Sequence, residues 1–218
     1  MKNYTHIIMG LALVCGSQTL WANQPSSAQI VQWIKNIDAS NASPERAIKV
    51  DETKPVTLYS GEKAYLSAVT YENSGRNFWG GYILTRPQLR QSQILEFGGQ
   101  SNTFRIHSIY KNEREFDLIE FESESSGQGE VSQSLTLTYI NNWQVKELWD
   151  VESGSFAGRY KDELNDVDCK TGYDHSAFIN LLPFDGRIVE TTVKSNACDN
   201  KTNKDYKVTS QVIELRIP

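Results

Sequence analysis

The sequence predicts a mainly β protein with one amphipathic helix near its N-terminus. From about Val56 onward, runs rich in β-branched and aromatic residues recur about every 8–12 residues, with Gly, Asn, Ser or Pro between them. Only one stretch near the N-terminus spaces its apolar residues as a helix does. Strands at this spacing are typical of an antiparallel β-sandwich, a barrel or a partial propeller, and the sequence leaves these three architectures open.

The chain begins with the features of a secretory signal peptide. Lys2 precedes an apolar run over residues 7–14, and small residues then lead to Ala22. The run is about eight residues long, whereas a membrane-spanning helix needs about 20. We therefore expect residues 1–22 to be cleaved, the mature chain to have no membrane span, and the protein to be periplasmic or secreted. An uncleaved helix and a lipid anchor at Cys15 are the alternatives.

The remaining residues, 23–218, are expected to form a single mainly-β domain that starts with a helix over about 26–39. Ser26 or Ser27 can cap this helix, and Pro44 follows its end. One face carries the apolar residues Ile30, Ile34 and Ile37. We expect this face to pack on a sheet; docking of a partner protein is the alternative.

The expected strands follow the helix in order. They cover residues 63–71, 78–85, 93–97, 103–110, 116–121, 134–140, 143–151, 177–182, 187–193 and 206–217. The pair Asp185-Gly186 is a hairpin signal between two of these strands. Turns that contain Ser-Gly or Thr-Gly recur at a spacing of about 50 residues, near the period of a propeller blade.

Charge and cysteine content bound the class of partner and the redox state. The whole chain has a formal charge of -5, and removal of Lys2 with the signal peptide leaves -5 - 1 = -6. An acidic protein repels phosphate backbones, so we expect no nucleic-acid partner and favour a cationic protein. Of the three cysteines, Cys15 leaves with the signal peptide, and Cys169 and Cys198 are expected to form a disulfide. That bridge would stabilise the fold by about 3–4 kcal/mol.

No motif for catalysis, metal binding or a cofactor is evident. The chain has no Gly-x-Ser-x-Gly elbow, and its mature histidines are His107 in a strand and His175 in a polar turn. A zinc site needs three or four converging ligands, and the residues around His175 lack the spacing for one. We therefore predict no metal and no cofactor.

An acidic segment spans residues 113–130 and includes Glu120, Glu122 and Glu124. Such a cluster most often forms a solvated face, and it can also attract a cationic partner. The alternative function is that of a carbohydrate-active hydrolase, which would use two of these carboxylates together with sugar-stacking tryptophans. An envelope module that binds a small ligand is a third interpretation.

A short loop provides a further binding candidate. Residues Ser74, Gly75, Arg76 and Phe78 are similar to the Ser-Gly-x-x-Tyr loop of periplasmic lysozyme inhibitors, with Phe78 in place of tyrosine. The resemblance implies a loop that enters the cleft of an enzyme. It covers residues 74–78 alone and does not establish membership of that family.

Together these features predict a non-catalytic periplasmic protein that binds and inhibits or neutralises another protein. A cell-wall-degrading enzyme or a toxin is the expected kind of target, because such enzymes are often cationic and this chain is acidic. The tentative binding residues are those of the loop and the acidic segment: Ser74, Gly75, Arg76, Phe78, Glu120, Glu122 and Glu124.

Overall fold

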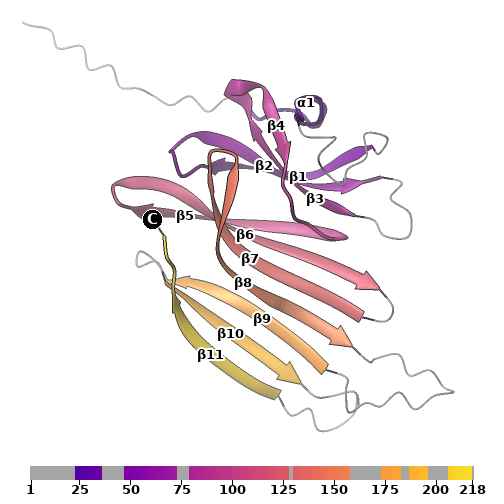
Figure 1. Ribbon diagram of the computed structural model, residues 1–218, viewed down its shortest axis with the longest axis vertical. Coiled ribbons are helices and arrows are strands. Elements are labelled where there is room, and N and C mark those ends of the chain that lie inside the picture. The colour runs from indigo at the N-terminus through magenta and orange to yellow at the C-terminus, as the bar shows by residue number, and fades with distance from the viewer. Residues whose placement is uncertain are drawn as a thin grey trace, which may run out of the picture.

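The computed structural model describes residues 23–35, 47–72, 79–127, 130–157, 173–182, 187–195 and 206–217. They form two antiparallel sheets, one of four strands in the order β1-β2-β3-β4 and one of seven in the order β11-β10-β9-β8-β7-β6-β5 (Figure 1). The elements are α1 Ser27–Gln32, β1 Ile48–Thr57, β2 Lys63–Tyr71, β3 Gly80–Arg86, the 3₁₀ turn η2 Pro87–Leu89, β4 Gln91–Ile94, β5 Ser101–Lys111, β6 Arg114–Gly127, β7 Glu130–Asn141, β8 Gln144–Ala157, β9 Tyr173–Leu182, β10 Arg187–Ser195 and β11 Tyr206–Glu214.

This architecture confirms the mainly antiparallel β prediction and fits a β-sandwich. In both sheets every strand pairs with its neighbours in sequence, so each sheet is a meander. The second sheet continues through seven strands without division into four-stranded blades, which argues against the propeller. No closed barrel is found in the part of the chain that the structure describes.

The helix is shorter than the sequence predicts. It begins as expected, because Ser26 caps it and Gln29 returns a side-chain bond to the Ser26 amide, a capping box. It ends at Gln32, where the chain turns onto the edge of β4. There the Ser92 amide donates to the Trp33 carbonyl at 2.8 Å, and the Lys35 backbone amide donates to the Ser92 carbonyl at 3.1 Å. Pairing with a strand edge thus takes the place of the helix over residues 33–35, which the local pattern could not reveal. Residues 36–39 of the predicted helix, Ile37 among them, lie outside the described residues.

One strand was not predicted. β1 contains Lys49, Asp51, Glu52 and Pro55, residue types that are depleted in strands. It forms because it lies at the edge of its sheet, where proline and charge are tolerated, and a register shift between Val50 and Glu52 accommodates the irregularity.

Elsewhere the predicted strands are confirmed, with shifts of several residues at some ends. β2 has the predicted limits, and β6 to β8 extend further than expected. The β5–β6 hairpin turns at Asn112 and Glu113, both with positive φ, and β7 turns into β8 at Asn142, which also has a positive φ. The Asp185-Gly186 turn and the cysteines Cys169 and Cys198 lie outside the described residues.

The two sheets pack face to face through an aromatic core. Phe121 of β6 lies 4.5 Å from Tyr82 of β3 and 4.5 Å from Phe97, measured between ring centroids. On the other face of the four-stranded sheet, Ile30 of α1 is buried against Val69 and its neighbours. The predicted packing of the helix on a sheet is therefore confirmed, and the fold has three layers: helix, sheet and sheet.

A second core lies on the far face of the seven-stranded sheet. It includes Phe116 and Leu137 from the central strands and Ile188 from β10. The C-terminal residues leave β11 and run back toward β5 (Figure 1), where Leu215 and Ile217 are buried in this core. The tail therefore covers apolar surface at one end of the sheet.

Within the described residues, no helix combines the length and the hydropathy needed to cross a bilayer.

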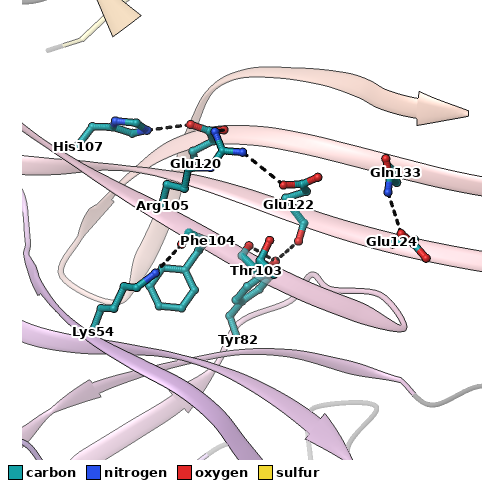
Figure 2. A network of polar contacts seen from close by, with 10 residues as sticks. All are labelled: Lys54, Tyr82, Thr103, Phe104, Arg105, His107, Glu120, Glu122, Glu124 and Gln133. Carbon is teal, nitrogen blue, oxygen red and sulfur yellow. Dashed lines mark hydrogen bonds and ion pairs between the residues drawn. The ribbon is translucent and has the colours of Figure 1, made fainter. Parts of the chain in front are cut away.

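Tyr82 links the sheets by hydrogen bonds as well as by packing. Its hydroxyl lies 2.9 Å from the Thr103 carbonyl oxygen and 2.7 Å from that of Glu122, the two residues of one β5–β6 pair (Figure 2). Burial raises the pKa of Tyr82 above its ordinary value, because an ionised phenol would lose its hydration there.

We expect Tyr82→Phe to lower the free energy of unfolding by about 1–2 kcal/mol at neutral pH, since these carbonyls lose a buried donor. A raised pKa favours the protonated phenol in the folded state, so its contribution is present below about pH 10 and lost as the pH rises further. Urea unfolding at several alkaline pH values should therefore show a steeper loss in the wild type than in the variant. Parallel pH profiles would contradict this role of Tyr82.

Candidate functional site

The acidic residues of β6 form a row on one face of the strand. Glu120, Glu122 and Glu124 alternate along β6 and therefore point to the same side of the sheet. The neighbouring strand β5 places Arg105 directly opposite Glu120, and His107 two residues away on the same face (Figure 2). The sequence identified the three acids but not their partners Arg105 and His107, which the register of β5 places beside them.

Glu120 is almost completely buried. Its residue is 2% exposed, and its carboxylate contacts both side chains: Arg105 Nη1 lies 3.0 Å from Oε1 and His107 Nε2 lies 2.8 Å from Oε2. The Arg105 contact has the distance of an ion pair without the alignment of a hydrogen bond. Because an unpaired charge is costly in such a place, the pairs explain how the carboxylate is tolerated.

The other two acids are more exposed and also have partners within the chain. Glu122 Oε2 lies 3.7 Å from Arg105 Nη2, with the Glu122 side chain 35% exposed. Glu124 accepts a hydrogen bond of 2.7 Å from the amide of Gln133 on β7. The row is thus a strip of intramolecular contacts between β5, β6 and β7. Its partly exposed carboxylates are those of Glu122 and Glu124.

Asp117, which precedes this row on β6, faces the other sheet. It accepts a hydrogen bond of 2.6 Å from the Thr57 amide at the end of β1 and one of 2.6 Å from the Ser108 hydroxyl. Its residue is 5% exposed. Asp117 therefore links the four-stranded sheet to the seven-stranded sheet by hydrogen bonds, and we assign it a structural role.

A second pair of carboxylates lies on β8. A register shift between Leu137 and Thr138 of β7 places Glu147 and Asp150 on the same face of β8. Desolvation raises the pKa of Glu147, and the neighbouring charge and hydrogen bond of Asp150 raise it further. Both residues are exposed, and in the described residues no group of three metal-ligating side chains is found.

The part of the seven-stranded sheet formed by β9, β10 and β11 carries apolar side chains on its exposed side. Phe178 is directly opposite Thr191, which is opposite Ser210, and the Thr191 and Ser210 hydroxyl oxygens are 3.0 Å apart. Directly paired residues share a face. We call this side the outer face and define it by Phe178, Val189, Thr191, Val193, Val208, Ser210 and Val212.

Three large apolar residues of the outer face are exposed: Phe178 by 46%, and Val208 and Val212 by 59% each. The opposite side of the same strands holds Ile179, Ile188 and Ile213, which belong to the second core. Contiguous apolar side chains on a sheet face are typical of interaction sites. The sequence predicted these strands but not this surface, because apolar residues occur on both sides of the strands.

The remaining sequence-predicted binding residues, Ser74, Gly75, Arg76 and Phe78, lie outside the described residues. The structure therefore brings together Glu120, Glu122 and Glu124 and does not place the loop relative to them.

These features define a two-sheet antiparallel β protein with an internally paired acidic row and an exposed apolar sheet face. Comparison with protein-family models, with curated proteins and with solved structures gave no match.

Proposed function

We propose that this chain is an exported, non-catalytic protein that binds another protein through the outer face. The observation that carries the proposal is the exposure of Phe178, Val208 and Val212 on one side of three paired strands. An aromatic side chain surrounded by valines and hydroxyl groups suits the centre of a protein interface, where aromatic anchors supply most of the binding energy.

The kind of target follows from export and charge. A chain with a formal charge of -5 attracts cationic proteins, and cell-wall-degrading enzymes and toxins of the periplasm are the class we favour. The attraction comes from the net charge of the chain more than from Glu120, whose carboxylate is already paired with Arg105 and His107. Inhibition of the bound enzyme is the function that this interaction would serve.

The hydrolase alternative gains no support from the acidic row. A glycosidase needs one carboxylic acid and one carboxylate that both reach a sugar. Glu120 is 2% exposed and contacts both Arg105 and His107, so it has neither the access nor the freedom that this chemistry requires.

Affinity capture from an envelope extract tests the proposal. The full chain is expressed with export, and the purified protein is compared with Phe178→Ser and with the matched control Leu89→Ser, because Leu89 lies in the 3₁₀ turn η2 and is also 46% exposed. We expect the wild type and Leu89→Ser to retain one protein near stoichiometrically, and Phe178→Ser to bind it about tenfold or more weakly.

Two results would overturn the proposal. One is the retention of no protein by the wild type. The other is equal retention by Phe178→Ser and by the wild type, which would place the binding surface elsewhere.

A further inference from the structure

The described strands leave four sheet edges, and three of them carry features that discourage pairing with another strand. β1 has Pro55, four charged side chains and a register shift. β4 is only four residues long and is covered by the parallel bridge between Ile34 and Ser92. At β5, the Lys54 ammonium group donates to the Phe104 carbonyl at 3.1 Å (Figure 2).

The fourth edge, β11, has none of these features. It pairs with β10 over nine consecutive residues without a register shift, and the described residues give it a neighbour on that side alone. Its central residues, Val208–Ile213, contain neither a charge nor a proline. A long regular edge of this kind presents its backbone donors and acceptors to another strand.

The side chains of β11 indicate which strand fits this edge. Val208 and Val212 are placed symmetrically about Ser210 and are equally exposed. On β10, Val189 and Val193 repeat the same symmetry about Thr191. A two-fold interface requires a surface that is complementary to itself, and the outer face has this pattern.

We propose that β11 pairs in antiparallel fashion with β11 of a second copy, with the two-fold axis at Ser210 and perpendicular to the sheet. In this register Ser210 lies opposite Ser210, and Val208 lies opposite Val212 of the second copy. Such an axis keeps the outer faces of both copies on the same side, so the two seven-stranded sheets become one continuous sheet.

The charges of β11 are compatible with this arrangement. Lys207 lies near the start of the strand and Glu214 at its end. Antiparallel pairing places Lys207 opposite Ile213 and Glu214 opposite Tyr206 of the second copy, whereas parallel pairing in register would bring like charges together. From Lys207 to Ile213, no charge falls opposite a like charge.

The dimer is independent of the proposed target protein. It uses the backbone edge of β11, while the side chains of the outer face remain directed away from the sheet. Dimerisation would place two outer faces side by side and would give a bound protein two equivalent surfaces.

Sedimentation velocity of the exported, purified protein over about 1–100 µM tests the association. We expect a concentration-dependent dimer in the wild type and about fivefold weaker association in Ser210→Lys, which places two like charges opposite each other at the axis. A mixture of Ser210→Lys and Ser210→Asp should recover the dimer. Thermal unfolding followed by circular dichroism shows whether each variant is folded.

Cysteine trapping gives an independent measurement with a nearly isosteric change. Ser210→Cys should form a disulfide-linked dimer on mild oxidation, because opposite residues lie within reach of a disulfide. The control Thr209→Cys should not, because in this register residue 209 lies opposite residue 211 and faces the other side. A wild type that stays monomeric would overturn the proposal, as would a dimer that Ser210→Cys does not trap or that is insensitive to Ser210→Lys.

Discussion

Replacement of Phe121 by alanine should lower the free energy of unfolding by about 3–5 kcal/mol, the largest effect that we expect from one substitution. Phe121 is 2% exposed and lies on the side of β6 that faces the four-stranded sheet. Its ring contacts Tyr82 and Phe97, each at 4.5 Å between centroids. Loss of the ring removes apolar burial and leaves a cavity between the sheets, where the backbones limit collapse.

Urea unfolding of the wild type and Phe121→Ala measures this effect. Phe178→Ala serves as a matched control, because it removes the same ring from an exposed position and should change the stability by less than about 1 kcal/mol. Similar losses in the two variants would contradict the face-to-face packing of the sheets.

The second large effect concerns the buried Glu120. The double variant Arg105→Ala/His107→Ala removes both side chains that contact its carboxylate. We expect the free energy of unfolding to fall by about 2–4 kcal/mol at neutral pH, since a buried charge without a partner costs more than the pair itself contributes. Arg105 is 62% exposed, and the water that replaces it keeps the loss below the value for a fully enclosed pair.

The triple variant that also carries Glu120→Leu separates charge from packing. It removes the buried charge, and the stability should return to within about 1 kcal/mol of the wild type. Chemical denaturation of the wild type and both variants at neutral pH measures these effects, and equal losses in the double and triple variants would show that the charge of Glu120 is not the cause.

The sequence predicted best those elements whose signals are local. β2 has its predicted limits because apolar and β-branched residues run through it from Lys63 to Tyr71. α1 was predicted too long because its end depends on hydrogen bonds to Ser92, a residue far along the chain. β1 was missed because the edge of a sheet tolerates charge and proline that the middle of a sheet does not.

The functional surfaces also combine features that local sequence indicates with features that depend on distant contacts. Composition alone identified the acidic row, but the pairing of Glu120 with Arg105 and His107 depends on the register between β5 and β6. The outer face depends on which side of β9–β11 the second core covers, and Ile179 and Phe178 are neighbours with opposite environments. Alternation predicts that a strand has two faces, and only the packing decides which one meets solvent.

Binding of a protein by the outer face is the central claim, and photo-crosslinking in intact cells tests it most directly. Phe178 is replaced by a photoreactive benzoyl-phenylalanine, which keeps an aromatic group at the same place. We predict a crosslinked adduct between this chain and a different protein, together with no such adduct when the probe replaces Leu89. The absence of any adduct at residue 178, or an adduct that contains only two copies of this chain, would contradict the claim.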